Sequence, residues 1–186
     1  NVEDIKGTRA AISRYGSGSH LMAYINAKNH NWDLENDLNF EVIKNLDGAI
    51  RGLTEGKADY FMWEKFTTKP IVDDGIFRRI DNCPSPWPCF VIAVREDFIE
   101  NDEEALKTIL EIVNQTTAEF KSIPSIDKTI ANRYEQELTD VQEWLSLTEW
   151  SQSVMNEKTI NNVQDQLYNL NIIPKKVEYS KLIHKL

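Results

Sequence analysis

The stretch that decides the fold is Arg9-Ala10-Ala11-Ile12-Ser13-Arg14-Tyr15-Gly16-Ser17-Gly18-Ser19-His20. Residues 9–15 have the residue types of a β-strand, and apolar residues at helical spacing begin after about His20. Between them, two glycines permit tight or left-handed turns and a close approach of the backbone to a ligand. Ser19 is a candidate N-cap of the helix. The stretch therefore predicts a strand, a loop rich in glycine and serine, and a helix, in that order.

Shorter apolar runs continue this alternation of strands and helices toward the C-terminus. The predicted elements are strands at 40–43 and 58–66, a helix at 47–55, one helical turn within 67–74, and strands at 76–80 and 89–94. Strands that are separated by helices need crossover connections, and such connections produce parallel pairing. The N-terminal half is therefore predicted to be α/β with a largely parallel sheet.

The pattern becomes almost entirely helical after Arg95. Apolar residues recur at helical spacing in four segments. Three of the predicted helices follow candidate caps at Asn101, Ser125 and Thr139, and the fourth spans 157–170. The sequence thus divides into an α/β part and a helical part.

The composition is that of a folded protein with an excess of acidic residues. The chain has 186 residues, of which 41% are hydrophobic, and a formal net charge of −9 at pH 7. It is long enough to bury a core as one domain or as two small lobes. The negative charge disfavours nucleic acid as a partner, because phosphate binding needs a basic surface. No apolar run approaches the roughly 20 residues of a membrane-spanning helix, so no transmembrane segment is predicted.

Little in the sequence indicates catalysis or metal binding. Cys83 and Cys89 form either one disulfide bridge or two free thiols, and their spacing does not suit a zinc site. The motifs of zinc proteases, of serine hydrolases and of cysteine nucleophiles are missing. The sequence therefore predicts a protein without enzymatic activity or bound metal, and it leaves the compartment open.

The loop before the first predicted helix is the strongest candidate for a binding site. The hydroxyl groups of Ser17 and Ser19 supply hydrogen bonds, and the helix directs free N–H groups and the positive end of its dipole to the same place. This combination suits a carboxylate, a sulfonate, a phosphate or a polarised heterocycle. Arg14 precedes Gly16 by two residues and would add a positive charge. The alternatives are a plain strand-to-helix turn with a serine cap, and an arginine that merely faces solvent.

Two further segments place tryptophans where a ligand could bind. The predicted strand at 58–66 carries Trp63 and Glu64 near its end, and ligands of open α/β sheets bind outside the carboxyl ends of the strands. Trp63 would stack on a planar ligand, and Glu64 would accept a hydrogen bond from it. Trp87 lies in a stiff segment, Pro84-Ser85-Pro86-Trp87-Pro88, and would form one wall of a ligand pocket. The alternatives are a core position for Trp63 and a purely structural loop for the proline-rich segment.

These segments together resemble a known family. Residues 6–20 look like the start of the second lobe of the solute-binding proteins of ABC importers for nitrate, sulfonate, taurine and thiamine-precursor ligands. Residues 46–53 continue the resemblance, and residues 56–66 are similar to a family stretch with an aspartate and then a tryptophan–glutamate pair. Residues 87–91 resemble the family's return strand. The resemblance covers about 4–112, and it extends to fungal homologues of the bacterial proteins.

The resemblance implies an α/β, type II periplasmic-binding-protein-like lobe with a central mixed sheet flanked by helices, followed by a C-terminal helical part. Residues 1–95 would form the second, ligand-binding lobe, and residues 96–186 would return to the first lobe. A small anionic or heteroaromatic solute would bind in the cleft between the lobes, without a cofactor. Its polar head would be held by Ser17, Gly18, Ser19 and His20, with Trp63 and Glu64 lining the cleft.

The resemblance also bears on partner, compartment and completeness. It implies an ABC permease as partner, at the periplasmic side of a bacterial membrane, whereas a fungal homologue would be cytoplasmic. Asn1 corresponds to a point beyond most of the family's first lobe. The chain is therefore expected to be a fragment whose helices after Arg95 expose apolar surface. Two alternatives stay open: an enzyme related to thiamine-pyrimidine synthase, and an effector-binding domain of a sensory regulator.

Overall fold

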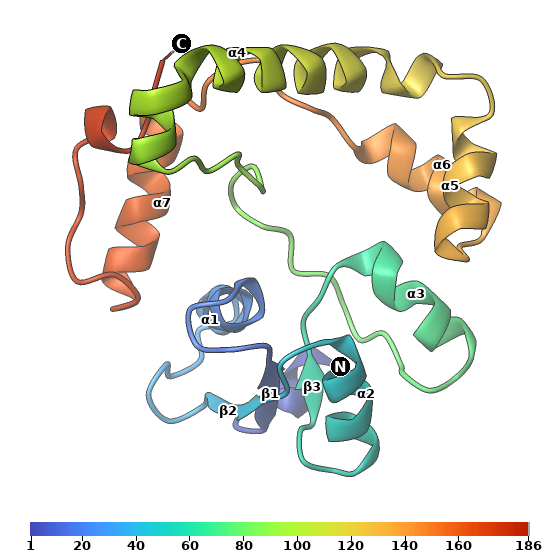
Figure 1. Cartoon of the computed structure of the whole chain (residues 1–186). Coiled ribbons are helices and arrows are strands. Elements are labelled where there is room, and N and C mark those ends of the chain that lie inside the picture. The colour runs from blue at the N-terminus through green and yellow to red at the C-terminus, as the bar shows by residue number, and fades with distance from the viewer. Residues whose placement is uncertain (186) are drawn as a thin grey trace. The chain divides into compact units, whose positions relative to one another are not determined.

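The computed structural model describes residues 1–185, so that Leu186, the last residue of the expected segment 96–186, lies outside the described part. The chain forms two compact units (Figure 1). The sheet unit spans Asn1–Pro86, and the helical unit comprises the residues from Trp87 on. The division of the chain into lobes at 95/96 stays a prediction.

A three-stranded sheet forms the centre of the sheet unit, with strand order β2-β1-β3. Its strands are β1 (Arg9–Ile12), β2 (Asn39–Val42) and β3 (Tyr60–Phe61). Both neighbours run parallel to β1, with Ala10 beside Phe40 on one side and beside Tyr60 on the other. The sheet is therefore parallel throughout, as the crossover connections predict, and it is not mixed, as the resemblance implied.

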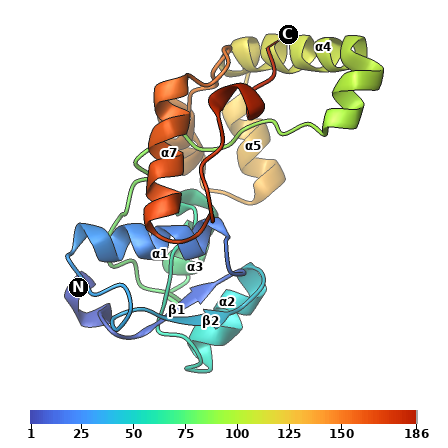
Figure 2. The ribbon, with the colours of Figure 1, turned by 90° about the vertical axis from the view of Figure 1, so that its left-hand side faces the viewer.

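Two helices provide the crossovers and cover opposite faces of this sheet (Figures 1 and 2). They are α1 (Gly18–Asn29) and α2 (Leu46–Thr54), and a short 3-10 helix, η1 (Val2–Ile5), precedes β1. On one face, Ala10 of β1 packs with Ala23 of α1 in a buried cluster. On the other face, Ala11 packs with Ala49 of α2 in a second buried cluster. Because consecutive residues of a strand point to opposite faces, the pair Ala10-Ala11 brings both helices close to the sheet.

Helix α2 lies especially close to the backbone that follows β2. A Cβ atom added at Gly48 would lie 1.8 Å from the carbonyl oxygen of Ile43. A Cβ atom at Gly52, one turn later, would lie 3.0 Å from Cγ2 of the same isoleucine. Asn45 caps the helix by accepting a hydrogen bond from the N–H of Gly48 at 2.9 Å. The helix can adopt this position only because a glycine occupies position 48.

The remaining part of the sheet unit differs from the sequence prediction. The strand predicted at 58–66 contracts to Tyr60–Phe61, and the single turn predicted within 67–74 is a nine-residue helix, α3 (Lys65–Asp73). The strand predicted at 76–80 is irregular. A strand needs a neighbour for its backbone groups, and residues 76–80 pair with no strand within the described part of the chain. Residue types alone therefore overestimated the extent of the sheet.

The helical unit begins with an exposed irregular segment and continues with helices. The helices are α4 (Glu96–Glu119), α5 (Ile126–Tyr134), α6 (Leu138–Leu147) and α7 (Glu157–Asn169), with short 3-10 helices η2 (Phe120–Ser122) and η3 (Tyr179–Lys181). The strand predicted at 89–94 is absent, and Phe90 is 93% exposed. This segment pairs with no strand among residues 1–185.

Two predicted caps of the helical unit are wrong, and one is right only in position. The first long helix begins at Glu96, not after Asn101, but it has a kink with non-helical angles at Asp102. Thr139 lies inside α6, whose N-cap position is occupied by Glu137. Ser125 occupies the N-cap position of α5, although its side chain makes no capping hydrogen bond. The helical periodicity located the helices but not the residues that begin them.

The expected apolar surface is present on α4. Ile109, Ile112 and Val113 are exposed, Ile112 to 61%. None of the helices in residues 1–185 is both long enough and apolar enough to cross a membrane.

We expect Gly48→Ala to destabilise the sheet unit by about 3 kcal/mol, because the added methyl group would force a backbone carbonyl to move. Hydrogen exchange across residues 39–61, measured by mass spectrometry in increasing urea, would show the loss. Gly18→Ala is the matched control, since a Cβ atom at Gly18 meets nothing within 4 Å. Equal stability of the two variants would contradict the close approach of α2.

Candidate ligand-binding site

The candidate site lies where β1 and β3 end. Because the two strands are parallel neighbours, the loop after β1 (residues 13–17) and the segment after β3 (residues 62–64) emerge at the same edge of the sheet. Helix α1 begins directly after the first of these loops, at Gly18. The site therefore combines two strand ends with a helix N-terminus, as the sequence predicts.

A short chain of hydroxyl groups fixes the loop after β1. The backbone N–H of Ser13 donates to Oγ of Ser19 at 3.0 Å, and Oγ of Ser19 lies 3.0 Å from Oγ of Ser17. Oγ of Ser17 in turn accepts from the N–H of His20 at 3.3 Å. The N-cap is therefore Ser17, and not Ser19 as predicted, because the Ser19 side chain turns back to the end of β1. Both serines are buried.

Of the predicted donors, the structure uses the serine hydroxyl groups within the loop and leaves two backbone N–H groups without an acceptor. Within residues 1–185, the N–H groups of Gly18 and Ser19 donate no hydrogen bond, because they belong to the first turn of α1. The Ser17 and Ser19 hydroxyl groups are already engaged with each other. Ser13 is half-buried, and its Oγ lies 3.5 Å from Oγ of Ser19. The sequence analysis did not select Ser13, although its position directly after the strand was a usable signal.

The His20 ring lies inside the sheet unit. It is 6% exposed, and its Nδ1 accepts a hydrogen bond from the N–H of Gly16 at 3.1 Å. It contacts the rings of Tyr15, Tyr24 and Phe40 edge to face, with centroid distances of 4.7–5.2 Å. Burial lowers the pKa of His20 below its ordinary value of 6.5, because the charged ring would lose its hydration. The His20 ring is therefore buried under the loop after β1 and bonded to the backbone of that loop.

Arg14 and Tyr15 face solvent at the rim of the loop. The carbonyl of Arg14 accepts a hydrogen bond from the N–H of Ser17 at 3.2 Å, so the backbone of the loop is a closed turn. Gly16 has a φ of +75°, which a residue with a side chain rarely adopts. The arginine side chain is therefore carried on an ordered loop beside the helix N-terminus.

Trp63 and Glu64 follow the end of β3, and the structure gives them different surroundings. The Trp63 ring stacks on Phe61 at a centroid distance of 5.0 Å and leaves 42% of the residue exposed. The Glu64 carboxylate accepts hydrogen bonds from the N–H and the Oγ1 of Thr67, both at 2.7 Å. Glu64 is the N-cap of α3 and does not end a strand, because the chain turns into a helix one residue later.

Trp87 and the two cysteines lie near the boundary of the two units. Trp87 is half-buried and belongs to the helical unit, whereas the loop after β1 belongs to the sheet unit. Cys83 and Cys89 are both free thiols. Burial and the neighbouring charge of Asp81 raise the pKa of the Cys83 thiol. Among residues 1–185, no group of three or more histidine, cysteine or acidic side chains could hold a metal ion.

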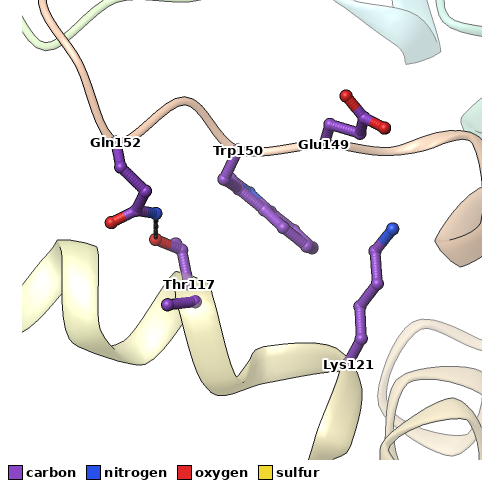
Figure 3. Close-up of a pocket in the computed structure, with 6 residues that line it drawn as sticks. Thr117, Lys121, Glu149, Trp150 and Gln152 are labelled. Carbon is purple, nitrogen blue, oxygen red and sulfur yellow. Dashed lines mark hydrogen bonds between the residues drawn. The ribbon is translucent and has the colours of Figure 1, made fainter.

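The helical unit has a pocket of its own, of about 290 Å³ (Figure 3). It lies between the end of α4 and residues 149–152. Trp150 reaches toward the helix, and Gln152 donates a hydrogen bond to Oγ1 of Thr117 at 3.0 Å. The Trp150 ring packs edge to face on Phe120 and Trp144. None of the predicted site residues lines this pocket.

Comparison with known proteins relates this architecture to one fold. Residues 1–83 match the model of a family described as Ca3427-like PBP. The solved structure of the Candida albicans CA3427 gene product, which exhibits the generic periplasmic binding protein fold, superimposes with a TM-score of 0.82 at 22% identity. The chain has a periplasmic-binding-protein-like fold. No curated protein matches the sequence significantly.

Two bacterial structures share the periplasmic-binding-protein-like fold. The alkanesulfonate-binding protein SsuA from Xanthomonas axonopodis pv. citri, bound to MOPS, matches with a TM-score of 0.75 at 15% identity over 98% of this chain. The periplasmic aliphatic sulphonate binding protein SsuA from Escherichia coli matches with a TM-score of 0.62 at 12% identity over 100% of this chain. The CA3427 match covers 91% of this chain. This chain spans 58%, 64% and 61% of the three solved chains.

The role of Glu64 as a cap can be tested directly. Glu64→Ala is expected to weaken the first turn of α3 by about 1 kcal/mol, because the N–H of Thr67 loses its acceptor. Hydrogen exchange of residues 65–69 would become faster. Glu64→Ser supplies another capping oxygen and should restore most of the protection. Unchanged exchange in Glu64→Ala would show that the cap contributes nothing.

Proposed function

We propose that this chain carries the head-group site of a small-solute-binding protein, and that the solute is an organic anion of the sulfonate type. The observation that carries the proposal is the pair of N–H groups of Gly18 and Ser19, which donate no hydrogen bond within residues 1–185, at the start of the twelve-residue helix α1. The periplasmic-binding-protein-like fold supports it, because two solved proteins with this fold bind sulfonates.

The chemistry of a sulfonate suits these donors. Its oxygens only accept hydrogen bonds, and it stays ionised at all physiological pH values. The N–H groups of Gly18 and Ser19 would donate to one oxygen each, the Ser13 hydroxyl to another, and the helix dipole would favour the negative charge. Arg14 would add a positive charge at the rim. The Ser17 and Ser19 hydroxyls would act indirectly, by holding the loop in shape.

The tail of the solute would meet Trp63. Its ring is half-exposed and is held against Phe61, so it offers a rigid apolar surface at the end of β3. An alkyl chain or a heteroaromatic ring fits this surface equally well. Glu64 would take part only by beginning α3.

In a bacterium the bound solute would be handed to an ABC permease at the periplasmic side of the membrane, and binding would need no cofactor. If this chain comes from a fungus, as the Candida albicans protein does, it would bind the solute in the cytoplasm. A protein of this function acts by a closing cleft, to which a second lobe contributes.

Gly18→Ala tests the proposal without disturbing the loop. The new methyl group has open space in the free chain, but it would occupy the position where an anion approaches the N–H groups of Gly18 and Ser19. Affinity for hexanesulfonate, measured by calorimetry, is expected to fall at least about tenfold with unchanged thermal stability.

The control is Glu157→Ala, at the first position of α7, which should leave the affinity unchanged. Ser17→Ala is less informative, because it also removes the helix cap. If the unaltered chain binds hexanesulfonate and Gly18→Ala binds it equally well, the head-group site is elsewhere.

A further inference from the structure

One hydrogen bond joins the tip of the binding loop to a side chain that can change its charge. The backbone N–H of Gly16 donates to Nδ1 of His20 at 3.1 Å. Nδ1 can accept only while it carries no proton, so this bond exists only with a neutral ring whose hydrogen is on Nε2. Protonation of Nδ1 would replace an acceptor by a donor and set two N–H groups against each other.

The surroundings of the ring leave no other arrangement for the added charge. Nε2 is buried and has no hydrogen-bond partner within residues 1–185. The ring is enclosed by the aromatic rings of Tyr15, Tyr24 and Phe40. His20 is also the third residue of α1, where the positive end of the helix dipole opposes a cation.

The groups that face His20 would not compensate the charge. From the loop and from α1 it meets the rings of two tyrosines, and from β2 it meets a phenylalanine. The nearest charged residue in the loop is Arg14, which is also positive. No carboxylate in the described part of the chain forms a hydrogen bond or an ion pair with the ring.

We propose that His20 is a positioning residue that makes the loop after β1 sensitive to pH, with the Gly16–His20 hydrogen bond as its switch. The loop is held while the ring is neutral, and it is released when the ring is protonated. For solute binding, the inference rests on the proposed function, because the same loop leads into Gly18 and Ser19. Affinity for the anion should then fall as the pH falls, although the ring gains a positive charge.

The burial of the ring determines how stability changes with pH. Burial lowers the folded-state pKa of His20 below 6.5, so the ring is neutral at pH 7 and above. In the unfolded chain the ring takes up its proton near pH 6.5. The contribution of neutral His20 to stability is therefore complete above about pH 6.5, and it decreases as the pH falls from there toward the lower pKa of the folded state.

The first test uses the free chain and needs no ligand. Nuclear magnetic resonance would follow the amide proton of Gly16 and the ring protons of His20 from about pH 7.5 to about pH 5. Both signals are expected to shift with one common midpoint below 6.5. A Gly16 amide signal that does not follow the His20 titration, or a midpoint at or above 6.5, would overturn the proposal.

The second test separates the acceptor from the ring. His20→Asn places an amide oxygen near the position of Nδ1 and cannot titrate, whereas His20→Phe keeps the ring and removes the acceptor. Hexanesulfonate affinity of the unaltered chain should fall about tenfold for each pH unit below the midpoint. His20→Asn should show a flat profile, and His20→Phe a weak affinity at every pH.

His30→Gln is the matched control, since His30 ends the same helix and bonds to the carbonyl of Asn26. It should keep the profile of the unaltered chain. An affinity that rises at low pH would show that the charge of His20 attracts the anion directly, and would overturn the proposal. If the unaltered chain binds no sulfonate, the proposed function fails, while the ligand-free titration still decides the role of His20.

Discussion

The sheet unit depends on the packing of two consecutive alanines in its central strand. Ala10 and Ala11 point to opposite faces of β1, and each meets an alanine of a covering helix, Ala23 of α1 and Ala49 of α2. Small side chains on both sides let the helices approach closely, and a larger residue at either position would push one helix outward. The same close approach on the α2 side makes Gly48 indispensable. The helix positions, and with them the loops at the strand ends, follow from this contact.

The position of α1 on the sheet determines the shape of the loop after β1. Once α1 lies on the sheet, its first turn comes within hydrogen-bond distance of the strand end, and Ser19 and His20 reach back to Ser13 and Gly16. The side chains that carry the strongest sequence signal therefore hold the loop, while the backbone N–H groups of Gly18 and Ser19 donate no hydrogen bond within residues 1–185. Such a division is common where helix N-termini bind anions, because backbone donors keep their geometry without a loss of side-chain entropy.

Sequence reasoning located the elements that a local pattern determines, and it failed where a segment's structure depends on a neighbouring strand or helix. It placed β1, β2, α1 and α2, because each has a distinct period and a clear beginning or end. It failed at 89–94, where residues typical of a strand have no neighbouring strand among the described residues. It also failed at Glu64, whose carboxylate begins a helix that the pattern did not reveal at full length. The contact of Ser13 with Ser19 was missed, because a single serine gives no periodic signal.

The sequence by itself determined the order of strands and helices, the parallel pairing in the N-terminal half, and the location of the candidate loop. Alternation of element types requires crossovers, and glycine with serine before a helix marks the loop. Only the tertiary structure decided which polar groups are used internally and which make no hydrogen bond within residues 1–185. Ser17, Ser19 and His20 are polar in the sequence and equally suited to a ligand, but all three are buried. The serines bond to each other and to the end of β1, and His20 packs against Phe40 and the two tyrosines. Whether a polar group binds a ligand or holds a loop depends on its neighbours in space, and these are brought together only by the packing of α1 on the sheet.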